Sequence, residues 1–238
     1  MLKVLYEDNH LIAVFKPAGV LSQGDKTGDI SIFEEVKKYL KEKYKKPGNV
    51  FLGLVHRLDR PVSGIILFAK TSKGAARLSE QFRNHKVEKT YHAIVIGKPD
   101  KNRGVLINNL IKDEKLKKAR SATGKNLDNT KEAKLYYEVV PMPKASRMLD
   151  RIGIKSNNNY SLLKIKLETG KFHQIRSQLA LAGLPILGDV KYGYKSPLPD
   201  KSVALCATGI SFYSVTENKK INLSVPIVIH RAGLDLLL

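Results

Sequence analysis

Short apolar runs separated by turn-forming residues recur along the chain, and this pattern constrains the fold more than any other feature of the sequence. Most neighbouring runs are linked by turns, and few are linked by helical crossovers. The sequence therefore predicts an α+β fold with a mainly antiparallel, mixed β-sheet flanked by helices. The predicted strands lie within residues 2–16 (two strands), 64–69, 87–97, 104–111, 132–140, 160–168, 202–214 and 220–224.

Three segments have helical periodicity together with start or stop signals. The first follows a capping box, in which Ser31 precedes Glu34 by three residues, and Pro47-Gly48 is expected to end it. The other two are predicted from Ser72 to about His85 and from about His173 to Ala182. The strands outnumber these helices, which supports the sheet-based fold.

A basic, polar stretch at residues 112–134 separates two of the predicted strands, and we interpret it as a mobile hairpin loop. The chain has no tandem repeat and no linker rich in Pro or Ser. We therefore expect a single domain over residues 1–238.

The charge of the chain indicates its partner class. The chain carries 42 Lys plus Arg against 22 Asp plus Glu, a formal net charge of +20. An excess of this size favours a polyanion, although lysine-rich faces also keep proteins soluble. Residues 37–46 hold six lysines and one acid, Glu42. We interpret them as a solvated helix face with cations near the C-terminal dipole, and give RNA contact a secondary role.

Several classes of protein are disfavoured. No apolar run approaches the roughly twenty residues that span a bilayer, and Cys206 has no second cysteine to pair with. Glu7 and Asp8 stand where a signal peptide would be apolar, so we expect a cytoplasmic protein without membrane contact. The histidines lack zinc-pair spacing, and neither a glycine-rich phosphate loop nor a Gly-x-Ser-x-Gly elbow occurs. We expect no metal and no cofactor.

Asp59 is the acidic side chain most suggestive of chemistry. It lies in an otherwise apolar segment, with Arg57 two residues before it, Arg60 directly after it and Pro61 constraining the backbone. Arginines around a carboxylate hold it ionised, so that it can act as a nucleophile or a base. Taken alone, the segment is explained at least as well by a buried ion pair or a turn cap.

A second segment shifts this balance. Residues 168–176 place a tight turn directly before a helix, with Lys171, His173 and Arg176 in or near its first turn. Cations at a helix N-terminus form a natural seat for a phosphate or a carboxylate. The alternative is an amphipathic helix with a basic edge.

These segments resemble a known family. His56-Arg-Leu-Asp-Arg-Pro-Val-Ser-Gly64, followed by Ala69-Lys70, is similar to the signature of the RluA-type RNA pseudouridine synthases. Three further blocks resemble the same family in the same order along the chain. They are Leu5-Tyr-Glu-Asp8 through Gly19, Lys89-Thr-Tyr-His-Ala-Ile-Val-Ile-Gly97, and Thr169-Gly-Lys-Phe-His-Gln-Ile-Arg176 with residues 183–193.

The resemblance implies isomerisation of uridine to pseudouridine inside RNA, without a metal or an organic cofactor. Asp59 matches the catalytic aspartate of the family, Tyr91 the tyrosine that stacks on the flipped uracil, and Arg176 the cation that pairs with the aspartate. The implied fold is the synthase catalytic fold with a basic central cleft. Residues 112–134 are expected to order when RNA binds.

The resemblance also implies a set of substrate-binding residues. Arg57 matches an arginine that occupies the space left by the extruded base. We place His56, Lys70, Lys171 and His173 with it, with a scaffold role as the alternative for both histidines and for Lys70.

The expected partner is structured RNA, either ribosomal or transfer RNA, bound by a monomer. The family blocks begin within the first residues of the chain, so we expect no separate N-terminal RNA-binding module. Two other function classes stay open: a non-catalytic RNA-binding or chaperone-like protein that retains the fold, and a metal-dependent nuclease.

Overall fold

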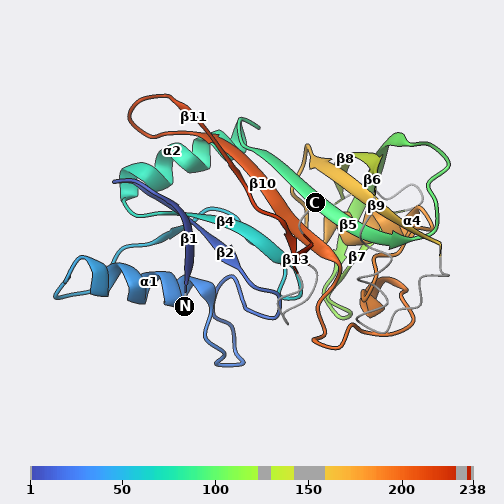
Figure 1. The fold of residues 1–238 in the computed structure, drawn as a ribbon, viewed down its shortest axis with the longest axis horizontal. Helices are drawn as coiled ribbons and strands as arrows, with labels where there is room; N and C mark the ends of the chain where they lie inside the picture. Colours follow the sequence, from blue (N-terminus) through green and yellow to red (C-terminus); the bar gives the residue numbers. More distant parts are fainter. Residues whose placement is uncertain (1, 123–129, 142–158, 229–234, 237–238) are drawn as a thin grey trace. The chain divides into compact units, whose positions relative to one another are not determined.

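The computed structural model describes residues 2–122, 130–141, 159–228 and 235–236. The chain forms two compact units, which are described separately (Figure 1). Unit 1 comprises Met1–Glu88 and Ala207–Val225, and unit 2 comprises Lys89–Cys206 and Pro226–Leu238. Whether the whole chain acts as one catalytic domain stays a prediction.

Unit 1 is built on strands in the order β1-β2-β4-β10, with β11 paired to β10 and β3 to β4. The pairs β1-β2, β2-β4, β3-β4 and β10-β11 are antiparallel. Two helices, α1 (Ile32–Lys43) and α2 (Ser72–Arg83), accompany these strands. The strands are β1 (Lys3–Glu7), β2 (Leu11–Lys16), β3 (Gly53–Leu54), β4 (Ser63–Ala69), β10 (Leu205–Tyr213) and β11 (Lys220–Ser224).

The central strand β4 of unit 1 is buried on both faces, because α2 packs on one side and α1 on the other (Figure 1). Leu78 of α2 packs on Leu11, Leu67 and their neighbours on one face. On the other face Phe33 of α1 meets Phe68 edge to face at 6.0 Å. Every residue of β4 is consequently buried. This explains why the sequence of β4 is continuously apolar where a half-exposed strand would alternate.

Unit 2 contains antiparallel strands in the order β5-β9-β8-β6-β7. The helix α4 (Gln174–Leu181) and the short 3₁₀ helix η1 (Val190–Tyr192) follow β9 in the chain. The strands are β5 (Glu88–Ile96), β6 (Arg103–Asp113), β7 (Lys118–Ser121), β8 (Lys131–Val140) and β9 (Tyr160–Leu167), and β12 (Ile227–Val228) pairs separately with β13 (Asp235–Leu236).

The predicted fold class is confirmed, as are the three helices and the main strands. Two details differ. The first helix ends at Lys43, with Tyr44 as its C-cap. It therefore ends before Pro47-Gly48, the pair that was expected to end it. The predicted loop at 112–134 contains β7, which pairs with the end of β6. Within β7 only Ala119 is buried, so the polar sequence of this strand gives little sign of it.

Residues 123–129 of that predicted loop lie outside the described residues. The expected ordering of 112–134 on RNA binding stays a prediction.

Gly64 provides a test of this architecture. It begins the buried part of β4 with φ +126°, and an added Cβ would overlap the backbone of Ala207 in β10. Gly64→Ala should lower the free energy of unfolding by about 2–4 kcal/mol, because both the backbone conformation and the close approach of two strands resist it. Urea denaturation measures the change.

Gly28→Ala is the matched control for this variant. Gly28 also has a positive φ, +76°, but an added Cβ would meet nothing within 4 Å. It should cost only about 1 kcal/mol. Equal losses in the two variants would show that the close contact with Ala207 contributes nothing.

Candidate active site

Asp59 lies on a loop, residues 56–62, that a neighbouring segment holds at several points. Ser22 Oγ donates to the carbonyl of Leu58 (2.6 Å) and accepts from the N–H of Leu58 (3.0 Å). The N–H of Gly19 donates to the carbonyl of Arg60 at 2.8 Å. The side chain of Asp59 is half-buried on this loop, which we call the Asp59 loop. Because its backbone bonds are made to segment 19–22, the carboxylate is held on a fixed frame.

A buried lysine lies under the same loop. Lys16, at the end of β2, has no exposed surface, and its Nζ donates to the carbonyls of Pro17 (3.0 Å), Val20 (2.7 Å) and Arg60 (3.3 Å). Burial lowers the pKa of Lys16 to about 7, and the negative charge of Asp59 opposes this shift. The ammonium thus ties three carbonyls around the Asp59 loop and interacts with the carboxylate.

Sequence reasoning missed the role of Lys16. In the sequence, Lys16 stands out only as part of the family block that ends at Gly19. The available signal was a lysine directly after five apolar residues, Leu11 to Phe15. A lysine is rarely buried without a polar partner, so this position marks a charged interior contact.

The two arginines beside Asp59 are both exposed. From the sequence, both arginines are predicted to keep the Asp59 carboxylate ionised. Arg60 instead binds Asp29 through Nη2 (2.6 Å) and the carbonyl of Gly19 through Nε (3.0 Å). Its guanidinium therefore reinforces the loop frame. The assignment of Arg57 to the space left by an extruded base stays a prediction.

His56 anchors the beginning of the loop. Its Nε2 accepts the N–H of Leu67 at 2.9 Å, and its ring stacks on Phe82 with ring centroids 5.1 Å apart. Since a backbone N–H can only donate, Nε2 carries no proton in this arrangement. These contacts support the scaffold alternative for His56.

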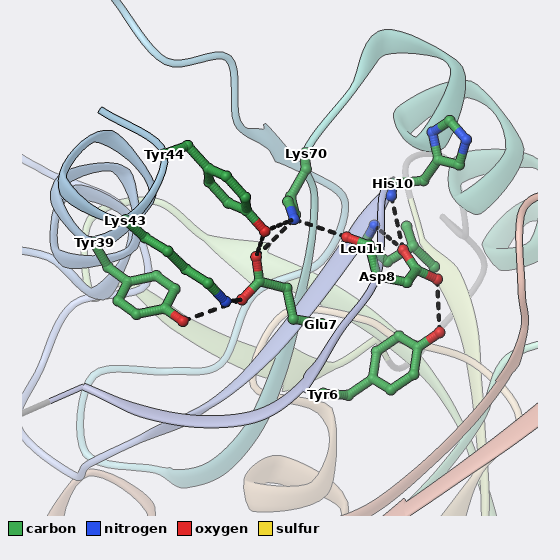
Figure 2. Close-up of polar contacts among 9 residues, drawn as sticks. All are labelled: Tyr6, Glu7, Asp8, His10, Leu11, Tyr39, Lys43, Tyr44 and Lys70. Atoms are coloured by element: carbon green, nitrogen blue, oxygen red, sulfur yellow. Dashed lines mark hydrogen bonds and ion pairs between the residues drawn. The ribbon is translucent and has the colours of Figure 1, made fainter. Parts of the chain in front are cut away.

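Lys70 is held inside a polar cluster that Figure 2 shows. Its Nζ donates to Glu7 (2.6 Å) and to the carbonyl of Asp8 (2.7 Å), and its side chain is only 10% exposed. This favours the structural alternative at the strand end. Binding of substrate by Lys70 stays a prediction.

Tyr91 occupies the middle of β5 in unit 2, opposite Ile165 of β9. It is 7% exposed and shares its strand face with Ala93 and Val95, which are also buried. The strand predicted within residues 87–97 is confirmed. The predicted stacking on a uracil is not tested.

The turn before α4 is fixed by a buried glutamine. Gln174 Oε1 accepts from the hydroxyl of Thr169 (2.8 Å) and the N–H of Lys171 (2.9 Å), and its Nε2 donates to the carbonyl of Lys134 (3.1 Å). His173 takes the N-cap position with φ 50° and makes no side-chain cap. The glutamine therefore fixes the turn that precedes the helix, and the N-cap position itself has no side-chain hydrogen bond.

Arg176 is the charged centre of unit 2. Its Nε and Nη2 donate to the two oxygens of Asp189 at 2.7 and 2.8 Å, and both side chains are almost fully buried. The guanidinium carbon lies 5.1 Å from the ring centroid of Tyr192. The Tyr192 hydroxyl is in turn 2.9 Å from His173 Nδ1 and accepts the N–H of Ala119 at 2.7 Å. These contacts fix the guanidinium in one orientation.

The segment that carries Arg176 is not an amphipathic helix with a basic edge. Residues 174–179 are all buried, including the polar side chains among them, whereas Ala182 at the helix end is exposed. Asp189 was not singled out by the sequence analysis, although it lies in the family block at 183–193. Its signal was an acid in an otherwise apolar run, Leu184 to Val190.

The structure thus brings the predicted residues together in two groups. His56, Arg57 and Asp59 share one loop in unit 1, while Lys171, His173 and Arg176 share the start of α4 in unit 2. The meeting of Asp59 with Tyr91 and Arg176 stays a prediction.

Two general findings complete the description. Within residues 2–122, 130–141, 159–228 and 235–236, no three His, Cys, Asp or Glu side chains gather where they could hold a metal ion. No helix in the same part of the chain is both long and apolar enough to cross a membrane.

Lys16 should make stability depend on pH. Its pKa is about 7 in the folded protein against an ordinary 10.5, so between these values the unfolded state binds the extra proton. The free energy of unfolding of the wild type, minus that of Lys16→Met, should therefore rise with pH over this window, by at most about 1.4 kcal/mol per pH unit. Below about pH 7 the difference should be constant.

The measurement is urea denaturation at several pH values from 6 to 10. Lys73→Met is the control, because Lys73 is exposed on α2 and keeps its ammonium in water. A difference that does not change with pH for Lys16→Met would refute the burial of a titrating ammonium. Should the variant fail to fold, a titration of Lys16 in the wild type by NMR decides the same point.

Asp189 should be required for the stability of unit 2. Asp189→Asn removes the buried counter-ion of Arg176 and should lower the free energy of unfolding by about 3 kcal/mol or more. Glu138→Gln is the control, because its pair with Arg103 is exposed and is worth at most about 1 kcal/mol. Similar effects of both changes on chemical denaturation would contradict a special role for the buried pair.

The chain is similar to proteins of one known family. Residues 10–181 match the model of the RNA pseudouridylate synthase family. A ribosomal large subunit pseudouridine synthase C of Rickettsia felis is 36% identical over 225 residues, which cover 92% of this chain and 66% of that protein. The chain therefore spans slightly less than two thirds of the length of that relative.

Two further proteins are similar. A tRNA pseudouridine synthase C of Yersinia pestis is 34% identical over 203 residues, covering 81% of this chain and 71% of that protein. In the solved structures, human RNA pseudouridylate synthase domain containing 4 shares the fold with a TM-score of 0.73 at 21% identity, over 95% of this chain and 88% of that one.

The matched blocks, the fold and these relatives agree: the chain belongs to the RNA pseudouridylate synthase family, and its resemblance to the RluA-type synthases is confirmed.

Proposed function

We propose that the chain is an RNA pseudouridine synthase that isomerises specific uridines in structured RNA, with Asp59 as the catalytic carboxylate. The observation that carries this proposal is the frame of the Asp59 loop. Ser22, Gly19 and Lys16 hold the loop by its backbone, and the Asp59 side chain is left half-buried. A reacting group must be held by rigid surroundings if it is to meet its target bond reproducibly.

The reaction requires one bond to break and another to form. The bond between C1′ of the ribose and N1 of uracil breaks, the base turns, and C1′ bonds to C5. The proton on C5 is lost and N1 gains one, so the product is an isomer of the substrate. The protein has to supply an ionised carboxylate beside the sugar and a seat for the turning base. Asp59 takes the first role, and no metal or organic cofactor is required.

Tyr91 and Arg176 complete the proposed site. Tyr91 stacks on the uracil after the nucleotide has flipped out of its helix, since any flipped base offers a π face. Arg176 pairs with Asp59 and keeps it ionised. A guanidinium has five N–H donors and Asp189 takes two of them, so one arginine can serve both carboxylates.

The proposed substrate is ribosomal or transfer RNA. The Rickettsia relative is named for the ribosomal large subunit and the Yersinia relative for tRNA. For this chain we propose the broader class, bound through a net charge of +20. Because bases in A-form helices are hard to read in the deep groove, selection relies on RNA shape and on an accessible loop. We propose further that the chain acts as a monomer in the cytoplasm.

Asp59→Asn tests the proposal. The variant should fold and bind RNA with nearly unchanged affinity, because amide and carboxylate have the same shape, but pseudouridine formation should fall at least about 10³-fold. The readout is pseudouridine content of unmodified ribosomal RNA and tRNA transcripts after incubation with the full chain.

Asp100→Asn is the matched control, because Asp100 is an exposed aspartate outside the site, and it should keep full activity. Appreciable turnover by Asp59→Asn would overturn the role of the carboxylate. Absence of pseudouridine with the wild type on every transcript, with RNA binding intact, would favour the non-catalytic RNA-binding alternative.

A further inference from the structure

Glu7 organises a cluster at the C-terminal end of α1, which Figure 2 shows in detail. The carboxylate accepts from Lys43 Nζ (2.7 Å), Lys70 Nζ (2.6 Å), Tyr44 OH (2.6 Å) and Tyr39 OH (3.1 Å). Its side chain is 9% exposed, and the side-chain hydrogen bonds from the lysines and Tyr44 outweigh burial and lower its pKa to about 2. We call these five residues the Glu7 cluster.

The cluster fixes an exposed aromatic ring. Tyr44 is 46% exposed, although its hydroxyl is bound to Glu7. The ammonium groups of Lys70, Lys43 and Lys46 lie 4.7, 5.5 and 5.9 Å from the centroid of its ring. The ring is thus held in place and surrounded by positive charge. A preorganised aromatic side chain loses little conformational entropy when a base stacks on it.

Further lysines extend the positive charge beyond the cluster. Lys41, Lys45 and Lys46 are exposed at the end of α1, and among the residues that the structure describes none of the three has an ion-pair partner. Lys45 and Lys46 follow the last helical residue, and their backbone N–H groups donate to the carbonyls of Glu42 (3.3 Å) and Lys41 (3.0 Å). These capping bonds use the backbone alone, so they require no cation at either position. Lys41 lies in the last turn, where its charge complements the helix dipole while its side chain stays exposed.

We propose that this surface, formed by Tyr44, Lys41, Lys45 and Lys46, is an RNA-binding site, with a base stacked on the tyrosine and phosphates bound by the lysines. The surface is distinct from the Asp59 loop. It rests on the proposed function, because it supplies a second contact for the same RNA substrate. Charge decides the occupant: a polyanion compensates the lysines, whereas a second copy of a chain with net charge +20 would be repelled.

Removal of the three lysine charges tests the site. In the full chain, the triple variant Lys41→Gln, Lys45→Gln, Lys46→Gln should bind a fluorescein-labelled 20-nucleotide RNA hairpin with a uridine-containing loop at least about tenfold more weakly at 0.1 M salt. The slope of log K against log salt concentration should become shallower by about 2, since each lost phosphate contact removes roughly 0.7. Fluorescence anisotropy gives both values.

The matched control removes the same charge elsewhere in unit 1. Lys73, Lys86 and Lys219 are exposed and lie outside the proposed surface. Their triple replacement by Gln should change the affinity by less than about threefold. Equal losses in the two triple variants would overturn the proposal, because they would show that only net charge matters. Unchanged binding by the α1 variant would overturn it as well.

Tyr44 tests the stacking contact. Tyr44→Ala should weaken binding about fivefold or more, whereas Tyr44→Phe, which keeps the ring and loses the bond to Glu7, should bind more tightly than the alanine variant. Equal binding by wild type and Tyr44→Ala would refute the stacked base. Melting temperatures of all variants are measured in parallel to confirm that they are folded.

Failure of this inference is distinguishable from failure of the proposed function. Pseudouridine formation by the wild type on ribosomal RNA and tRNA transcripts is measured separately. If the wild type isomerises uridine and the α1 variant binds the hairpin normally, only the second contact is wrong. If no pseudouridine forms but the α1 variant still loses RNA affinity, the surface stands and the enzyme assignment falls.

Discussion

The buried ammonium of Lys16 is the contact on which the candidate active site in unit 1 depends. One cation binds carbonyls on both sides of the interface between the end of β2 and the Asp59 loop. A lysine inside a protein is costly unless its donors are satisfied, and here three backbone oxygens satisfy them. The same geometry leaves the ammonium close enough to Asp59 for their charges to interact. Lys16 thus contributes both to the stability of the loop and to the electrostatic surroundings of the carboxylate.

Unit 2 also contains a buried cation, and a different set of groups satisfies its hydrogen-bond donors. Arg176 is buried together with its counter-ion Asp189, and the Tyr192 ring packs against the guanidinium. Gln174 bonds the backbone of the turn before α4. Buried polar groups of this kind tolerate few alternative arrangements, because each unpaired donor or acceptor is costly. They therefore specify one orientation of the arginine, whereas apolar side chains in their place would not.

Charge in this protein has two separate uses. Inside the fold, single carboxylates such as Glu7 and Asp189 bind cationic side chains and so fix helix ends and turns. On the surface, lysines such as Lys41 and Lys45 have no such partner among the described residues. Only the second kind is available to a polyanion. The net charge of the chain consequently overstates the number of cationic side chains that are available to bind RNA.

The sequence by itself determined the fold class, the three helices and the family. Those conclusions rest on local properties: the capping box at Ser31, the apolar run of β4, and ordered motifs along the chain. It also selected Asp59, because an acid in an apolar segment is conspicuous. It could not show that Arg60 binds Asp29, that Lys16 lies beneath the Asp59 loop, or that Arg176 is held by Asp189. These partners are 13 to 44 residues apart in the chain or face the loop from another strand. Only tertiary packing decides which charged side chains form pairs. Folding brings together residues that are distant in the chain, and such contacts produce no periodic pattern in the sequence.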